Sequence, residues 1–178
     1  LQEFVPAESL VINYVTLPDK LKALIHPENK ITEEQVQLVG KYTYQSPYGY
    51  YVATRDASWK MTTDFMPIED FHKTELHRLA LAPLGINYQI GGMLAMMDQT
   101  AHVITIHRTH QNFTERERTI LNKLHPHLVT SYLNAITVSR ANRSVTELKA
   151  VMETAPGAYG YFYKELTLAW LQPKAREW

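Results

Sequence analysis

The sequence has 8 histidines and no cysteine. Histidine is therefore the first residue type to consider for metal binding or acid–base catalysis. The absence of cysteine excludes thiol catalysis, disulfide bonds and cysteine-ligated metals. The closest pairs are His107 with His110 and His125 with His127. On a strand, His107 and His110 point to opposite faces, and Pro126 disturbs helical pairing of the other two. We therefore expect no metal site, and the sequence requires no cofactor.

Three carboxylates, Asp64, Glu69 and Asp70, surround the start of a predicted helix. Negative charge is favourable at a helix N-terminus, so capping explains these residues without catalysis. The chain contains no serine in a nucleophile elbow, no glycine-rich phosphate loop and no HExxH motif. We therefore predict that the chain is not an enzyme.

The composition narrows the class of protein. The 178 residues are 45% hydrophobic and 20% charged, which suits one compact domain with an appended element. The formal net charge is zero, so the chain as a whole does not attract nucleic acid or anionic lipid. No apolar run reaches the length of a membrane span, and residues 1–10 lack the pattern of a signal peptide. We expect a cytoplasmic protein that does not bind membranes.

Two hairpins are predicted to build an antiparallel sheet. Residues 9–17 are rich in β-branched side chains, and residues 21–26 follow a turn as their partner. Residues 86–97 and 101–109 form the second hairpin. Alternation in the first strand places Leu10, Ile12 and Tyr14 on one face and Val11, Asn13 and Val15 on the other.

Capping boxes mark the starts of two helices. Thr32 with Gln35 opens the first, and Thr114 with Glu117 opens a long helix that continues to about residue 154. We expect a kink or brief break in the long helix around Pro126.

The remaining segments are assigned from their composition and from the proline and glycine residues that end helices and strands. Residues 46–50 are expected to end the first helix, and the segment that follows, to residue 56, is expected to be irregular or weakly extended. Residues 59–65 are predicted as a short strand and residues 67–82 as a helix. Gly91-Gly92 predicts a bulge or the close approach of another backbone.

Two blocks of sequence, residues 62–90 and 113–135, carry recognisable motifs. The first contains Asp-Phe, a helix with a further Phe, and Pro-Leu-Gly, and the second reads Phe-Thr-Glu-Arg-Glu-Arg followed by Pro-His-Leu. Both resemble the GAF-like sensory domain that precedes a helix-turn-helix in many bacterial LuxR-type transcriptional regulators. The matching residues are Asp64, Phe65, Phe71, Pro83, Leu84, Gly85, Phe113, Thr114, Glu115, Arg116, Glu117, Arg118, Pro126, His127 and Leu128.

The resemblance implies an α+β fold in which helices flank a central antiparallel sheet of the GAF/PAS type. We expect a sensory domain over residues 1–140 and a helical extension and linker over residues 141–178. The tail of the linker resembles a strand-turn-strand and helix that precede the DNA-binding module in such regulators. Contact with DNA is expected only through a helix-turn-helix domain that is not present in this chain.

GAF-like folds often place a small-molecule pocket between the sheet and its neighbouring helices, and the resemblance implies one here. The alternative for each candidate residue is that it simply belongs to the hydrophobic core. The candidate ligand-binding residues are Tyr14, Trp59, Phe65, Phe71, His72 and Tyr88.

The long helix carries two adjacent apolar stripes, a broader face than contact with a single sheet requires. In sensors of this architecture such helices often pair across a two-fold axis, so we predict a homodimer. The residues assigned to the dimer helix are Leu121, Leu128, Tyr132 and Ile136.

The sequence thus predicts a ligand-sensing, dimerising regulatory domain of a bacterial transcriptional regulator that binds an unknown small molecule. A first alternative is a protein-interaction module without a small ligand, which a pocket filled by side chains would favour. A second is a small hydrolase or isomerase that uses His72 or His77 with Asp64 or Glu75. An open, polar pocket with a titrating histidine would favour that enzyme.

Overall fold

The computed structural model describes residues 5–16, 20–27, 31–154, 160–162 and 168–171. The chain divides into two compact units, Leu1–Ser131 and Tyr132–Trp178. This division and the predicted boundary after residue 140 both fall within one helix, α4 (Glu115–Thr154). The first unit contains the sheet, and the second contains the rest of α4 and a small hairpin.

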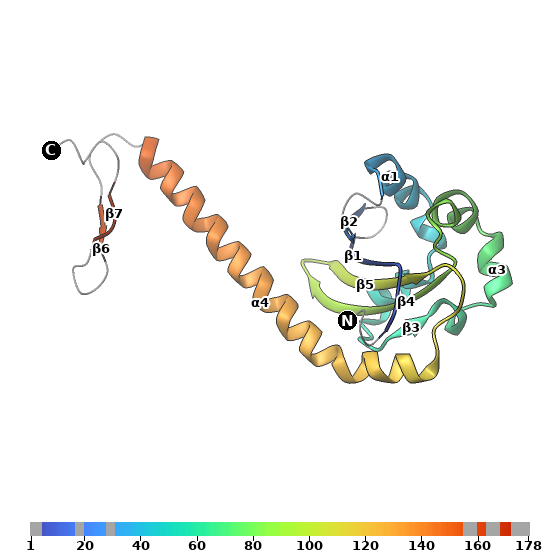
Figure 1. Ribbon diagram of the computed structural model, residues 1–178. Helices are drawn as coiled ribbons and strands as arrows, with labels where there is room; N and C mark the ends of the chain where they lie inside the picture. The colour runs from blue at the N-terminus through green and yellow to red at the C-terminus, as the bar shows by residue number, and fades with distance from the viewer. Residues whose placement is uncertain (1–4, 17–19, 28–30, 155–159, 163–167, 172–178) are drawn as a thin grey trace. The chain divides into compact units, whose positions relative to one another are not determined.

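Five antiparallel strands form the sheet, in the order β2-β1-β5-β4-β3 (Figure 1). Both predicted hairpins are present, β1 with β2 and β4 with β5. The turn between β4 and β5 has positive φ at Asp98 and Gln99, as a two-residue hairpin turn requires. The strands are β1 (Ser9–Thr16), β2 (Lys20–His26), β3 (Lys60–Met61), β4 (Tyr88–Met97) and β5 (Thr100–Arg108).

The sheet has two faces, which the register defines. One, here called the cavity face, carries Val11, Asn13 and Val15 of β1 together with Gln89 of β4 and Val103, Thr105 and His107 of β5. The other, here called the α4 face, carries Leu10, Ile12 and Tyr14 with Ile90, Ile104 and Ile106. The predicted alternation of β1 is therefore confirmed.

Short helices follow the first hairpin. The capping box of α1 (Glu33–Lys41) is present, because Thr32 and Gln35 each bond to the other's backbone N–H. The prediction of an irregular or weakly extended segment up to residue 56 is wrong, since η2 (Pro47–Gly49) and α2 (Tyr50–Thr54) occupy most of residues 46–56. A further turn, η1 (Thr43–Gln45), lies between α1 and η2.

The predicted helix over residues 67–82 is broken into shorter pieces. The first, α3 (Ile68–Lys73), ends at Thr74, whose backbone is extended at ψ 151°. The Thr74 hydroxyl donates to Phe71 O and accepts from His77 N, so it ends one helix and caps the next. The other pieces are η4 (Leu76–Leu81) and η5 (Ala82–Leu84). Before them, η3 (Thr62–Asp64) follows β3 and occupies part of the segment predicted as a strand over residues 59–65.

The long helix α4 begins where the sequence predicts. Thr114 N donates to Glu117 Oε2 over 2.8 Å, and Glu117 N donates back to Thr114 Oγ1 over 3.3 Å. The helix passes Pro126 without a break, and no described helix is long and apolar enough to cross a membrane. The first turns of α4 lie beneath the sheet, on the side away from α1 (Figure 1).

Two short strands of the tail pair as an antiparallel hairpin, β6 (Gly160–Phe162) with β7 (Leu168–Leu171). Two paired strands are therefore present in the tail. Its turn and the predicted final helix, residues 173–178, lie outside the described residues.

Candidate functional site

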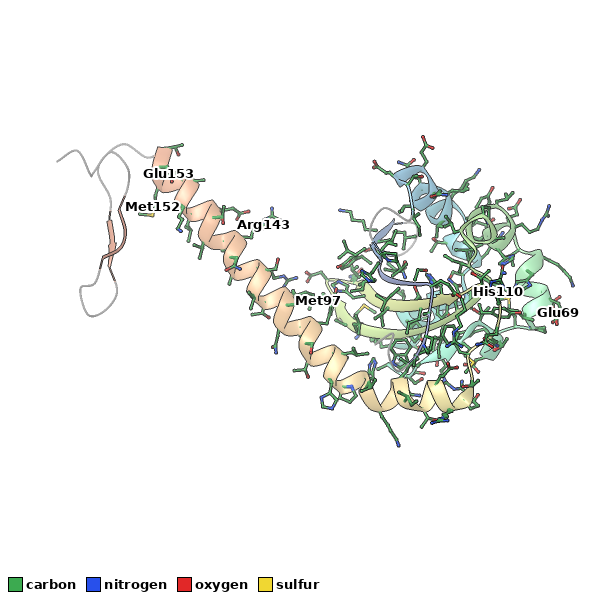
Figure 2. All side chains as sticks on the ribbon, in the orientation of Figure 1. Glu69, Met97, His110, Arg143, Met152 and Glu153 are labelled. Carbon is green, nitrogen blue, oxygen red and sulfur yellow. The ribbon has the colours of Figure 1, made fainter. Side chains whose placement is uncertain are left out.

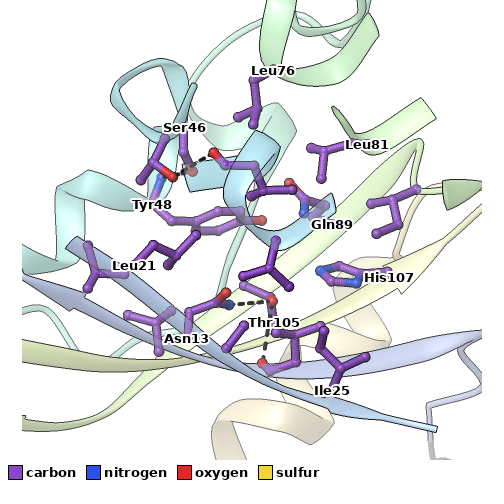
Figure 3. Close-up of a pocket in the computed structure, with 18 of the residues that line it drawn as sticks. Asn13, Leu21, Ile25, Ser46, Tyr48, Leu76, Leu81, Gln89, Thr105 and His107 are labelled. Atoms are coloured by element: carbon purple, nitrogen blue, oxygen red, sulfur yellow. Dashed lines mark hydrogen bonds between the residues drawn. The ribbon is translucent and has the colours of Figure 1, made fainter. Parts of the chain in front are cut away.

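A cavity lies between the cavity face of the sheet and the helical segments α1, η1, η2, η4 and η5 (Figure 3). About 90 Å³ of it is open to the centres of water molecules, well above what one water requires. Most of its wall is aliphatic. The aliphatic lining residues are Val11, Val15, Leu21, Ala23, Ile25, Ile31, Val36, Val39, Leu76, Leu81, Leu84, Ile86 and Val103.

The sheet contributes two groups of polar side chains to this wall. The first lies on β1 and β5, where Asn13 Nδ2 donates to Thr105 Oγ1 over 2.9 Å. The second lies on β4 and β5, where Gln89 and His107 are paired across the strands and His107 Nδ1 lies 3.1 Å from Ser9 Oγ. Figure 3 shows Gln89 and His107 toward one end of the cavity and Asn13 toward the other. The lining residues of the described chain include no Asp, Glu, Lys or Arg.

Tyr48 closes the cavity against β4. Its backbone N donates to Ser46 Oγ over 3.3 Å, and its hydroxyl lies 3.5 Å from both Lys60 O and Thr62 Oγ1. Burial raises the pKa of Tyr48 well above its ordinary value, the charge of Asp64 adds to this, and the hydrogen bond with Thr62 opposes it. The hydroxyl therefore stays protonated at neutral pH.

Two glycines of β4 allow aromatic rings to press on both faces of the sheet. A Cβ added at Gly91 would lie 2.9 Å from Cε1 of Tyr48, and one at Gly92 would lie 2.8 Å from Cε2 of Trp59. The close approach predicted at this pair is therefore made by side-chain rings, not by another backbone. The predicted bulge is also displaced, because the register of β4 shifts at Leu94.

The six candidate ligand-binding residues from the sequence are not among the residues that line this cavity. Tyr14 lies on the α4 face, where its ring packs edge-on against His102. Trp59 packs over Gly92 on the same face, as its contact shows. Phe65 packs against the Tyr48 ring, with centroids 6.1 Å apart, without lining the cavity. A ligand-binding role for these residues stays a prediction.

The other three candidates, Phe71, His72 and Tyr88, belong to a separate aromatic cluster near the start of β4. The rings of His72 and His77 stack with centroids 4.2 Å apart, and Nε2 of each lies 3.1 Å from an oxygen of Asn87. Desolvation lowers the pKa of His77, although the hydrogen bond with Asn87 opposes that effect. The uncharged form of His77 is therefore favoured inside the fold.

A hydrolase that used His72 or His77 would need a carboxylate from Asp64 or Glu75 bonded to the histidine, and the structure shows no such bond. Asp64 accepts from Met61 N over 2.8 Å and from Arg118 Nη1 over 2.6 Å, which supports its interpretation as a capping residue. Neither Asp64 nor Glu75 bonds to His72 or His77. The described residues also contain no group of three or more His, Asp or Glu side chains that could hold a metal ion.

The first turns of α4 are fastened to the sheet by polar contacts. Trp59 donates from its backbone N to Asn122 Oδ1 and from Nε1 to His125 Nδ1, each over 3.1 Å. Burial lowers the pKa of His125, which favours the neutral ring that accepts this bond. Arg108, with a 5% exposed side chain, pairs through both Nη atoms with Glu117. Burial raises the pKa of Glu117, but hydrogen bonds from Arg108 and the helix start outweigh it and hold that pKa below its usual value.

The residues assigned to a dimer helix differ in their exposure. Leu121 is completely buried, whereas Leu128, Tyr132 and Ile136 are half-buried. Most of the large apolar side chains that remain exposed on α4 lie in its second half, where Figure 2 draws the side chains as sticks. The exposed ones are Leu133, Val138, Val145, Leu148 and Val151.

Sequence reasoning missed Tyr48, Gln89 and His107 as residues of the cavity. The candidates were chosen because they are large aromatic side chains or lie near the two sequence blocks that resemble LuxR-type regulators. Such residues belong to the hydrophobic core more often than to a cavity wall. The useful signal was the alternation that places Asn13 among Val11 and Val15, because a polar residue on an otherwise apolar face marks a cavity wall.

No family model and no curated protein sequence matches the chain. Solved structures with a similar fold include the VqsR LBD domain from Pseudomonas aeruginosa, at 12% identity and a TM-score of 0.61 over 72% of this chain and 76% of that one. A GAF domain of a two-component sensor histidine kinase from Bacillus halodurans matches at 16% identity and a TM-score of 0.50, over 78% and 90% of the two chains. CepR2 from Burkholderia cenocepacia, an N-acylhomoserine lactone dependent LuxR family transcription factor, matches at 15% identity and a TM-score of 0.49, over 73% and 75%. The sheet, its helices and the first two of these likenesses show that the chain has a GAF-like α+β fold.

Proposed function

We propose that the chain is a ligand-sensing regulatory domain and that the cavity beneath α1 is its ligand site. The observation that carries this proposal is an open, mainly aliphatic cavity with polar side chains on two parts of its wall. Small-molecule sites have this composition, with a few polar groups that orient the ligand. The fold shared with the VqsR LBD domain supports the same function.

The cavity and α4 lie on opposite faces of β4, and this arrangement provides a route for a signal. Tyr48 presses on Gly91 from the cavity face, and Trp59 presses on Gly92 from the α4 face. Trp59 is in turn bonded to Asn122 and His125 of α4. A ligand that binds one position of the Tyr48 ring better than another would bias the position of α4.

The test is calorimetric titration with a panel of small apolar molecules, using two matched variants. Ala23→Phe fills the cavity from β2, whereas Ala53→Phe adds the same ring on the exposed side of α2. We expect saturable binding of one molecule per chain in the wild type and Ala53→Phe, and its loss in Ala23→Phe. Binding that survives in Ala23→Phe would move the ligand site elsewhere. The absence of binding to every member of the panel would favour a protein-interaction module.

We also propose that the chain forms a homodimer through the second half of α4. The apolar stripe there repeats at intervals of three and four residues, which is the spacing of a coiled-coil seam. Val138, Val145 and Leu148 are 50–62% exposed, so this stripe is available to a partner. The stripe consists of Val138, Ala141, Val145, Leu148 and Met152.

A second copy suits the stripe because the flanking positions carry little charge. Of Thr137, Asn142, Ser144 and Lys149, only the lysine is charged, and parallel pairing places it opposite Ser144 of the partner subunit. No like-charge pair therefore opposes parallel pairing at these positions. Light scattering at micromolar concentration should give the mass of two chains, and the mass of one chain would contradict the proposal.

We propose that the response to the ligand is control of transcription in a bacterial cytoplasm, through a helix-turn-helix domain outside these residues. The support is the resemblance of residues 62–90 and 113–135 to LuxR-type regulators. The encoding gene provides the test. A reading frame that continues beyond Trp178 into a helix-turn-helix supports the proposal, and a stop codon there contradicts it.

A further inference from the structure

Gln89 is a polar residue of the cavity wall whose amide is not used by the fold. Within the described chain its side-chain amide has no hydrogen-bond partner, although only 6% of the residue is exposed. Each of the other polar lining side chains makes at least one hydrogen bond: Asn13 with Thr105, Thr43 with Val39 O, Ser46 with Tyr48 N, Tyr48 with Thr62, and His107 through Nδ1 with Ser9, while Nε2 of His107 makes none. The amide of Gln89 lines the cavity without a bond to the protein, so it can hydrogen-bond to an occupant of the cavity.

The position of Gln89 directs its amide to the cavity and not to the core behind the sheet. Gln89 pairs with His107 across β4 and β5, and His107 pairs with Ser9 across β5 and β1. These three residues therefore form one row on the cavity face. Figure 3 shows the Gln89 side chain beside that of His107, among the residues that line the cavity.

The rest of the wall restricts the kind of molecule that can reach Gln89. Its lining contains no Asp, Glu, Lys or Arg among the described residues, so a charged ligand would lose its hydration with His107 as the one titratable side chain besides Tyr48 to face it. Tyr48 and His107 are the only rings that line it in the described chain, and the remaining contacts are mostly aliphatic. An aliphatic body fits this wall better than a flat aromatic one.

We propose that Gln89 selects the polar group of the ligand, and that the ligand is an uncharged aliphatic molecule with one group that both donates and accepts hydrogen bonds. The amide of Gln89 offers one acceptor oxygen and two N–H donors, which a primary amide or an alcohol complements. This inference rests on the proposed function, because it requires that the cavity binds a small molecule. It adds the chemistry of that molecule and the residue that recognises it.

The probes are decanamide, which has both donor and acceptor, and N,N-dimethyldecanamide, which keeps the carbonyl but has no N–H donor. Decanamide also carries an aliphatic chain, which suits the mainly aliphatic wall of the cavity. Decanoate and decylammonium provide charged chains of the same length at neutral pH. Binding of each probe is measured by calorimetry.

Two variants remove the amide of Gln89 while keeping a side chain of similar size, Gln89→Leu and Gln89→Met. Gln37→Leu on the exposed side of α1 makes the same change away from the cavity and serves as the control. The wild type and Gln37→Leu should bind decanamide about tenfold more tightly than the dimethyl amide, as expected for the hydrogen bonds involved. Both Gln89 variants should lose that preference, and they should bind the dimethyl amide no more tightly than the wild type, because its carbonyl loses the N–H donors of Gln89.

Three results would overturn the inference. If both Gln89 variants keep the preference for decanamide, another residue recognises the polar group. If the wild type binds decanoate or decylammonium more tightly than decanamide, the ligand is charged. If no probe binds at all, the ligand is not aliphatic. The calorimetric panel with Ala23→Phe tests separately whether the cavity binds any small molecule. Binding of a panel member that Ala23→Phe abolishes would keep the cavity as the ligand site even if none of these four probes binds.

Discussion

Replacing Gly92 by alanine places a methyl group where the indole of Trp59 lies. The new Cβ would be 2.8 Å from Cε2, 2.9 Å from Cδ2 and 3.1 Å from Nε1 of that ring, all shorter than ordinary contacts. The ring cannot move freely, because Trp59 is 1% exposed and its Nε1 donates to His125 of α4. The strand or the α4 contact must therefore shift.

The cost follows from two opposing effects. Overpacking of a buried site costs about 1–3 kcal/mol. Replacing glycine within a strand offsets about 0.5–1 kcal/mol of this, since alanine loses less backbone entropy on folding. Three ring atoms within 3.1 Å place this site in the upper part of the overpacking range, so we expect Gly92→Ala to lower the free energy of unfolding by about 1–2.5 kcal/mol. For a chain of this size that lowers the melting temperature by about 2–10 °C.

The assay is urea denaturation followed by circular dichroism, with Gly49→Ala as the control. An added Cβ at Gly49 meets nothing within 4 Å, and the backbone there is already helical with φ −55°. The control should be as stable as the wild type, or more stable by less than about 1 kcal/mol. If Gly92→Ala and Gly49→Ala unfold at the same urea concentration, the contact between Gly92 and Trp59 does not limit this position and the reasoning is refuted.

Two further predictions concern α4. Glu117→Gln removes the partner of the buried Arg108 and should lower the free energy of unfolding by about 2–3 kcal/mol at neutral pH, measured by denaturation. The pKa of Glu117 is lower in the folded state, so its contribution is complete above the unfolded pKa and lost as pH falls through the folded pKa. The difference between wild type and variant should shrink over that range, and a difference independent of pH would contradict the assignment. Leu148→Glu places a charge in the proposed dimer stripe and should give single chains in sedimentation experiments. The control Ala150→Glu places the same charge on another side of α4 and should stay dimeric. Equal masses for the two variants would exclude this stripe as the interface.

Local hydrogen bonds explain which elements could be predicted. The capping boxes of Thr32 with Gln35 and of Thr114 with Glu117 join atoms three residues apart, and both helices begin there. The alternation of β1 was equally readable, because a strand turns successive side chains to opposite faces. These features depend only on neighbours in the sequence.

Longer-range packing explains the errors. The segment over residues 46–56 has proline, glycine and aromatic residues that favour irregular structure in isolation. In the fold, Tyr48 packs on Gly91 and the hydroxyl of Tyr51 donates to Gly91 O, so contacts with β4 hold these helical turns in place. Thr74 breaks the predicted helix for a different reason, since its hydroxyl bonds the backbone on both sides.

The sequence by itself determined the α+β class, the two hairpins, the helix starts and the two faces of β1. Only the tertiary structure decided which face carries the cavity, and it placed Gln89 there and Trp59 on the opposite face. The physical reason is distance along the chain: the cavity wall combines β1, α1 and β5, and Trp59 is held by residues more than sixty positions away. Periodicity defines the faces of an element, but only packing between elements determines what each face meets.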